Sequence, residues 1–142
     1  MIAISAQVNN SQGRHEVTVT TNENAHSIAI EPRATGFGSS ANGGELLFLA
    51  LATCYCNDIY REAAKRGITV KSVEVTVSGG FDNAPGSAAE NVTYAARVEA
   101  EAGEAEIAEL MRHTDTVAEI QNTLRQGVSV RLASLQAVSV SP

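Results

Sequence analysis

Apolar and polar residues alternate along the first third of the chain. The alternation covers residues 2–8, 15–21 and 26–30. A period of two is typical of strands that bury one face and expose the other. Gly13 and the polar stretch 21–24 lie between these segments and supply the turns. The pattern therefore predicts a three-stranded antiparallel meander.

A long helix is expected next, after a loop rich in Gly, Ser and Asn at residues 32–44. Residues 45–66 consist largely of Leu, Ala, Glu, Lys and Arg, which favour helices, and Gly67 stands where a helix would end. The first half of this segment is apolar on every side, whereas residues 58–66 carry charges. We expect a central helix whose first half is buried all round and whose second half turns its charges to solvent.

The rest of the chain predicts a hairpin, two short helices and a last strand. Residues 68–77 and 92–100 alternate and are joined by a long connection, which indicates the hairpin. Residues 104–112 and 115–124 place apolar side chains at helical spacing. Thr114 or Asp115 is expected to cap the second of these helices and Gly127 to end it. Residues 128–140 are the predicted last strand, so the order is β-β-β-α-β-β-α-α-β, an α+β fold in one domain spanning residues 1–142.

The charge of the chain excludes some classes of partner. It has 142 residues, 10 Lys and Arg against 16 Asp and Glu, a net charge of −6 and no basic block. Proteins that bind nucleic acid backbones need clustered cations, so no nucleic acid is expected. The longest apolar run, residues 46–56, is about half of the ~20 residues that cross a bilayer, and the first residues do not resemble a secretion signal. We expect no membrane partner and a cytoplasmic location.

Candidate chemistry centres on two cysteines, Cys54 and Cys56. They are spaced C-x-C with no metal-ligand pattern elsewhere, so neither a metal nor a cofactor is expected. Two residues apart on a helix they point about 200° apart, which prevents a disulfide between them. Cys54 shares its face with Asp58 and Arg61 as well as with apolar residues, and such a boundary suits an amphiphilic electrophile such as an organic hydroperoxide. The alternative for either cysteine, and the preferred interpretation of Cys56, is a small packed hydrophobe.

The sequence around these cysteines resembles a known family. The segments GGELLFLALATC (residues 43–54), AKRGI (64–68) and VEVTV (73–77) resemble the OsmC/Ohr family of osmotically inducible and organic hydroperoxide resistance proteins. The run NTL at 122–124 followed by GV at 127–128 matches the end of the family's second signature. The resemblance implies antiparallel sheets wrapped around a long central helix, an intertwined homodimer, and a thiol-dependent peroxidase site at the dimer interface.

The resemblance also implies roles for particular residues. Cys54 corresponds to the peroxidatic cysteine, and Arg14 to the arginine that lowers its pKa, since a guanidinium stays protonated and favours a thiolate. The glutamate expected ten positions before the cysteine is Gly44 here, and Glu45 is the neighbouring candidate. The resolving cysteine falls at Ala118, so an external thiol has to reduce a sulfenic acid on Cys54.

Two functions stay open at this point. The first is a Cys54-based reductase of organic hydroperoxides in oxidative-stress defence, assisted by Arg14 and Glu45. The second is a non-catalytic dimeric module of the same fold that binds a small apolar ligand. A third, acyl transfer by Cys54, lacks a His or Asp placed by the sequence as a base. The deciding feature is a cation beside the Cys54 sulfur that holds it as a thiolate.

Overall fold

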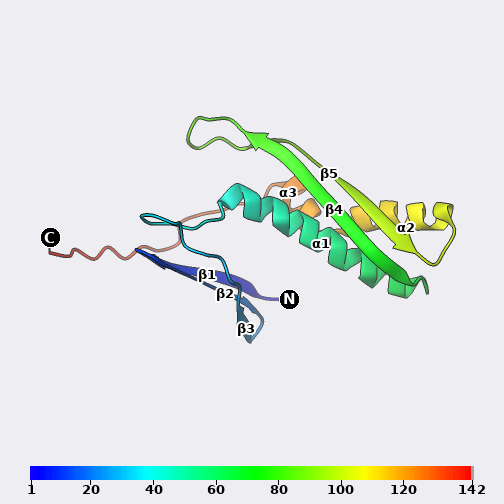
Figure 1. The fold of residues 1–142 in the computed structure, drawn as a ribbon, viewed down its shortest axis with the longest axis horizontal. Helices are drawn as coiled ribbons and strands as arrows, with labels where there is room; N and C mark the ends of the chain where they lie inside the picture. The colour runs from blue at the N-terminus through cyan, green and yellow to red at the C-terminus, as the bar shows by residue number, and fades with distance from the viewer. Residues whose placement is uncertain (142) are drawn as a thin grey trace. The chain divides into compact units, whose positions relative to one another are not determined.

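The computed structural model describes residues 1–141 and has an α+β fold, as predicted. Its elements are, in chain order, β1 (Ile4–Ser11), β2 (Arg14–Thr21), β3 (Asn24–Ser27), α1 (Gly43–Lys65), β4 (Val70–Phe81), β5 (Ala89–Ala100), α2 (Glu104–Val117) and α3 (Glu119–Gln126) (Figure 1). The chain forms two compact units. One comprises Met1–Leu49 with Gly80–Asn91, and the other comprises Ala50–Gly79 with the chain from Val92 onwards.

The predicted meander is confirmed in the first unit. β1 pairs with β2 in antiparallel register, with Ile4 opposite Thr21 and Ser11 opposite Arg14. β2 pairs in turn with β3, so the order in the sheet is β1-β2-β3. Gly13, in the turn between β1 and β2, has a φ of 74°, a conformation that glycine adopts without strain.

The expected burial of the first half of α1 is wrong for the single chain. Leu46 is 38% exposed and Leu49 is 59% exposed. Apolar residues of β1 are exposed too, with Ile4 at 75% and Val8 at 58%. An apolar pattern predicts that a surface will be covered but does not say by which chain. Among the described residues, none of the helices is long and apolar enough to cross a membrane.

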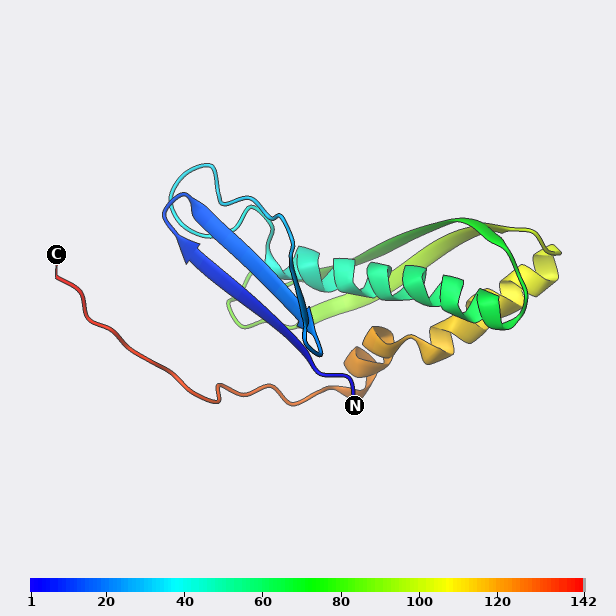
Figure 2. The same ribbon diagram turned by 90° about the horizontal axis from the view of Figure 1, so that it is seen from below.

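The core of the second unit forms where α1, β4, β5 and α2 meet. Its buried members are Tyr55, Ile59 and Ala63 of α1, Ile68, and Leu110 of α2. Half-buried side chains of β4 and β5 pack against them, among them those of residues 73, 75, 94, 96 and 98. Two views show the second half of α1 lying along the β4–β5 hairpin, whose strands run in opposite directions (Figure 1, Figure 2).

The second half of α1 does not turn all its charges to solvent, which corrects the prediction. Asp58 is 6% exposed and Glu62 is 4% exposed. Both carboxylates are paired with cations. Glu62 contacts Arg61 at 2.8 Å, Lys65 at 3.0 Å and His113 of α2 at 2.8 Å. Buried carboxylates persist in proteins only with such partners, because their desolvation is costly.

The two short helices are present, but their junction differs from the prediction. α2 extends to Val117, so Thr114 lies inside it and donates its hydroxyl to the Leu110 carbonyl at 2.8 Å. Ala118 is the extended residue between α2 and α3, and no side chain caps α3. The predicted caps, Thr114 and Asp115, are therefore wrong. Gly127 ends α3 as predicted, with a φ of 71° and its N–H donating to the Thr123 carbonyl.

The predicted last strand is absent, since residues 127–141 have no regular structure. Val130 is 92% exposed and Leu132 is 80% exposed. A strand needs a neighbour for its N–H and C=O groups, and no strand of the described chain pairs with this segment. The alternating pattern indicated that these residues suit an extended strand, but it does not predict which strand would pair with them.

Candidate functional site

Cys54 lies near the middle of α1, half-buried, with its sulfur turned towards the start of α3. The single proton of the thiol has two carboxylate acceptors in range, Asp58 Oδ2 at 3.6 Å from the sulfur and Glu119 Oε1 at 3.7 Å. The backbone N–H of Ile120, near the start of α3, lowers the pKa of the sulfur. The shared face of Cys54 and Asp58 follows from their spacing of four on one helix, so this prediction is confirmed.

Arg61 joins the two carboxylates that contact Cys54. Its Nη1 atom lies 3.1 Å from Asp58 Oδ1 and 2.9 Å from Glu119 Oε2. Each carboxylate therefore offers one oxygen to the guanidinium and the other to the sulfur. We refer to Cys54, Asp58, Arg61 and Glu119 as the Cys54 cluster.

The charges of the Cys54 cluster favour a protonated sulfur. Burial raises the pKa of the Cys54 thiol, and the Asp58 and Glu119 carboxylates raise it further, against the lowering effect of the Ile120 N–H. Burial likewise raises the pKa of Asp58 to about 6, and the neighbouring Glu119 carboxylate adds to the rise. The interaction of the two carboxylates lowers the pKa of Glu119. Near neutral pH Glu119 is thus ionised, Asp58 exchanges a proton readily, and Cys54 is a thiol.

The three acidic side chains of the cluster could also be considered as metal ligands. The sulfur and one oxygen of each carboxylate lie within 4.8 Å of one another. Arg61 already pairs with both carboxylates, so a metal ion would have to displace a guanidinium that never loses its proton. We therefore assign no metal to the cluster.

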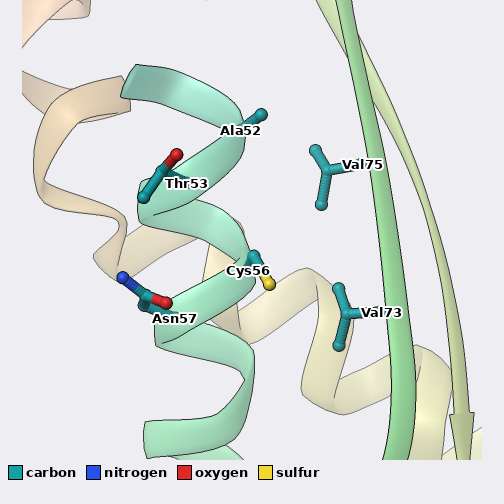
Figure 3. A pocket seen from close by; sticks show the side chains of 6 residues that line it. All are labelled: Ala52, Thr53, Cys56, Asn57, Val73 and Val75. Carbon is teal, nitrogen blue, oxygen red and sulfur yellow. The ribbon is translucent and has the colours of Figure 1, made fainter. Parts of the chain in front are cut away.

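Cys56 points to the other side of α1, as predicted. It lines a cavity of about 270 Å³ between α1 and β4, together with Ala52, Thr53, Asn57, Val73 and Val75 (Figure 3). Both cysteines are free thiols. The opposite directions of the two side chains leave Cys56 no access to the sulfur of Cys54.

Arg14 is the first residue of β2 and belongs to the first unit, whereas Cys54 belongs to the second. The Nη2 atom of Arg14 lies 2.6 Å from Glu16 Oε1, and both side chains are exposed. Its predicted action on the Cys54 thiol stays a prediction. Within the second unit, the cation of the Cys54 cluster is Arg61.

Glu45 caps the start of α1. Its Oε1 accepts the Asn42 N–H at 2.9 Å, and its own N–H donates to Asn42 Oδ1 at 2.8 Å. Such reciprocal bonds form a capping box, which satisfies N–H groups left free at a helix start. The predicted role of Glu45 in orienting Arg14 stays a prediction beside this structural one.

Comparison with known proteins places this architecture in a family. The sequence model of the family described as OsmC-like protein matches residues 36–133. This chain belongs to the OsmC-like protein family. The match covers the central helix with Cys54 and extends through α2 and α3, so the resemblance inferred from the sequence is confirmed.

Solved structures share the OsmC-like fold. An OsmC-like protein from Mycoplasma pneumoniae is 20% identical, with a TM-score of 0.61 over 88% of this chain and 87% of that one. An OsmC-like hydroperoxide resistance protein from Jannaschia is 15% identical, with a TM-score of 0.54 over 91% and 89%. An organic hydroperoxide resistance protein OsmC from Legionella pneumophila is 18% identical, with a TM-score of 0.51 over 87% and 89%. No curated protein matches the sequence.

The structure of this OsmC-like chain gives a physical reason for Gly44. A Cβ atom at this position would lie 3.0 Å from Phe81 Cε2 and 3.4 Å from Asn42 Oδ1. Phe81 is held there by stacking on Phe48, with ring centroids 6.2 Å apart. A side chain at position 44 would therefore require the Phe81 ring to shift by a few tenths of an ångström.

Sequence reasoning missed Glu119 as a neighbour of Cys54. The available signal was Ala118, which the family pattern aligned with the resolving cysteine. A residue that resolves Cys54 has to approach its sulfur, so the positions next to 118 were candidates for contact. The structure places Glu119 and the Ile120 N–H there, so α3 brings a carboxylate and a backbone donor to the sulfur.

Proposed function

We propose that this OsmC-like protein is a thiol-dependent reductase of organic hydroperoxides that acts in defence against oxidative stress. The observation that carries the proposal is the half-buried Cys54 sulfur in hydrogen-bond contact with the Asp58 carboxylate. The sulfur thus has beside it a group that can take its proton. Hydroperoxide resistance is named for the Jannaschia and Legionella proteins of the same fold, which supports the proposed substrate class.

The proposed reaction has two steps. The sulfur of Cys54 attacks the terminal oxygen of the hydroperoxide, the O–O bond breaks, and a sulfenic acid and an alcohol form. A small-molecule or protein thiol then condenses with the sulfenic acid to a mixed disulfide, releasing water, and a second thiol frees Cys54 as the reductant leaves as its disulfide. The external thiol is needed because position 118 is alanine and Cys56 points away.

A homodimer with the site at its interface is part of the proposal, as is a reducing compartment such as the cytoplasm. The exposed leucines of α1, Leu46 and Leu49, and the exposed apolar residues of β1 support it, because a second copy that covers them would bury apolar surface. In this assembly we expect Arg14 and Glu45 to contribute to the site. Light scattering after size-exclusion chromatography tests the assembly, and a monomer at micromolar concentration contradicts it.

The test of the reaction follows Cys54 itself. Reduced protein is mixed with cumene hydroperoxide, and sulfenic acid at Cys54 is trapped with dimedone and measured by mass spectrometry. The Cys56→Ala variant is expected to react as the wild type does, whereas Cys54→Ala should consume no peroxide. A Cys54 that reacts no faster than free cysteine rules the proposal out.

The second candidate is a non-catalytic dimeric module that binds a small apolar ligand. It is favoured by the raised pKa of Cys54 and by a cavity of about 230 Å³ lined by Leu51, Val92 and Leu124 with polar side chains beside them. The two functions predict different results for Cys54→Ala. Under the second, cells that carry this variant resist cumene hydroperoxide as well as wild-type cells do.

A further inference from the structure

Asp58 is the buried acidic group that lies against the sulfur. The Sγ–Oδ2 distance of 3.6 Å is a thiol–carboxylate hydrogen bond, and the two residues are one helical turn apart on α1. Only 8% of the Asp58 side chain is exposed. A proton lost by the thiol therefore has a direct acceptor that is largely shielded from water.

The carboxylate of Asp58 is held with one oxygen free for this task. Arg61 contacts Oδ1 at 3.1 Å and leaves Oδ2 to the sulfur. Arg61 is itself held by Glu62 at 2.8 Å and by Glu119 at 2.9 Å. Such a fixed guanidinium prevents the carboxylate from turning away, which is the arrangement expected of a positioned acid–base group.

We propose that Asp58 is a catalytic acid–base residue that takes the proton of the Cys54 thiol and returns it to the leaving alkoxide, with Arg61 as its positioning residue. This inference rests on the proposed hydroperoxide reduction. The S–H proton moves to Asp58 Oδ2, the sulfur bonds to the terminal oxygen as the O–O bond breaks, and the alkoxide takes the proton from Asp58. The sum is one thiol and one hydroperoxide converted to one sulfenic acid and one alcohol.

Glu119 also contacts the sulfur but is less suited to this role. Its side chain is 59% exposed, and its pKa is lowered, so it holds a proton poorly near neutral pH. The pKa of Asp58, at about 6, lies near the pH at which a group both accepts and returns a proton efficiently. The charged groups that face Asp58 are Arg61 on its own helix and Glu119 on α3.

The test compares two reactions of the same sulfur in the Asp58→Asn variant. Alkylation by iodoacetamide needs a thiolate, but its leaving group, iodide, needs no proton. Removing the negative charge of Asp58 favours the thiolate, so alkylation at neutral pH should become faster. Reduction of cumene hydroperoxide needs the returned proton, so sulfenic acid formation should become about 100-fold slower, within the range of general acid–base catalysis.

Opposite changes in the two rates support the inference, because damage to the fold or a purely electrostatic effect moves both rates in the same direction. The matched control is Glu109→Gln, because Glu109 is an exposed glutamate of α2 outside the Cys54 cluster that pairs with Arg112, and this variant should keep hydroperoxide reduction at the wild-type rate. Wild-type protein provides a measurement that needs no folded variant. Hydroperoxide reduction should be slower in heavy water, whereas alkylation at a pH where Cys54 is ionised should not.

The outcomes separate this inference from the function on which it depends. A wild-type Cys54 that reacts rapidly with cumene hydroperoxide, combined with an Asp58→Asn variant that reacts equally fast, overturns the role of Asp58 and leaves the reductase in place. An absent heavy-water effect on the wild-type reaction overturns it as well. A wild-type Cys54 that is no faster than free cysteine overturns both.

Discussion

The ionisation of Cys54 provides a quantitative prediction for the Glu119→Gln variant. Glu119 Oε1 lies 3.7 Å from the sulfur. A unit charge at that distance contributes about 1 kcal/mol when screened as in bulk water and about 4.5 kcal/mol at an effective dielectric constant of ~20. The Glu119 side chain is 59% exposed, so the lower figure applies. It corresponds to about a fivefold change in the ratio of thiolate to thiol. Removing an anion favours the thiolate, so the Cys54 pKa should fall and alkylation near neutral pH should become about fivefold faster.

The assay for this prediction is the pH dependence of Cys54 alkylation by iodoacetamide. The Cys56→Ala background leaves one thiol to observe. Glu109→Gln is the matched control, because Glu109 is an exposed glutamate of α2 whose carboxylate pairs with Arg112 at 3.8 Å. The control should leave the titration of Cys54 unchanged. A Cys54 pKa that stays the same or rises in Glu119→Gln refutes the placement of α3 against the sulfur.

Three further predictions concern stability. Ile59→Ala removes a side chain with 0% exposure from the core and should cost about 2–5 kcal/mol in urea unfolding, whereas Ile2→Ala, at a side chain 67% exposed and outside the strands, should cost much less. Contacts with Arg61, His113 and Lys65 lower the pKa of Glu62 to about 2. The stability that ionised Glu62 contributes is therefore complete above its unfolded pKa near 4.5 and is lost as pH falls towards 2. In Glu62→Gln the melting temperature should vary less with pH over that range than it does in the wild type. Gly44→Ala should lower the free energy of unfolding by about 1 kcal/mol, because the added Cβ would lie 3.0 Å from the Phe81 ring. A smaller residue at position 81 should relieve this loss. An equal loss with Phe81 and with the smaller residue contradicts the explanation.

The sequence predicted those parts of the fold that depend on neighbouring residues along the chain. Alternation located β1, β2, β4 and β5, and Gly67 and Gly127 ended their helices as expected, with φ values of 67° and 71°. The segment 128–140 shows the limit of this reasoning. Alternation describes a chain suited to a strand, but a strand forms only beside another one, and periodicity carries no information about that neighbour.

The candidate site was predictable to the same extent. The shared face of Cys54 and Asp58 follows from a spacing of four on one helix and was expected, whereas their direct contact was not. The contact with Glu119 depends on how α3 packs against α1, which local patterns do not encode. Burial of Asp58 and Glu62 was missed because charged residues were assigned to solvent. In the structure these two carboxylates share the cation Arg61.

The surroundings of Cys54 require a particular kind of activation. A peroxidatic thiol is usually activated by a cation that holds it as a thiolate before the peroxide arrives. In the second unit the available cation, Arg61, is already paired with three carboxylates, and two of these raise the pKa of the sulfur. A reactive Cys54 therefore needs either a second cation, for which Arg14 is the sequence candidate, or removal of its proton during the reaction, for which Asp58 is placed. The two routes differ in one observable. If Arg14 contacts the sulfur, both alkylation and hydroperoxide reduction become slower in Arg14→Ala. If the proton passes through Asp58, alkylation is not slowed in Asp58→Asn.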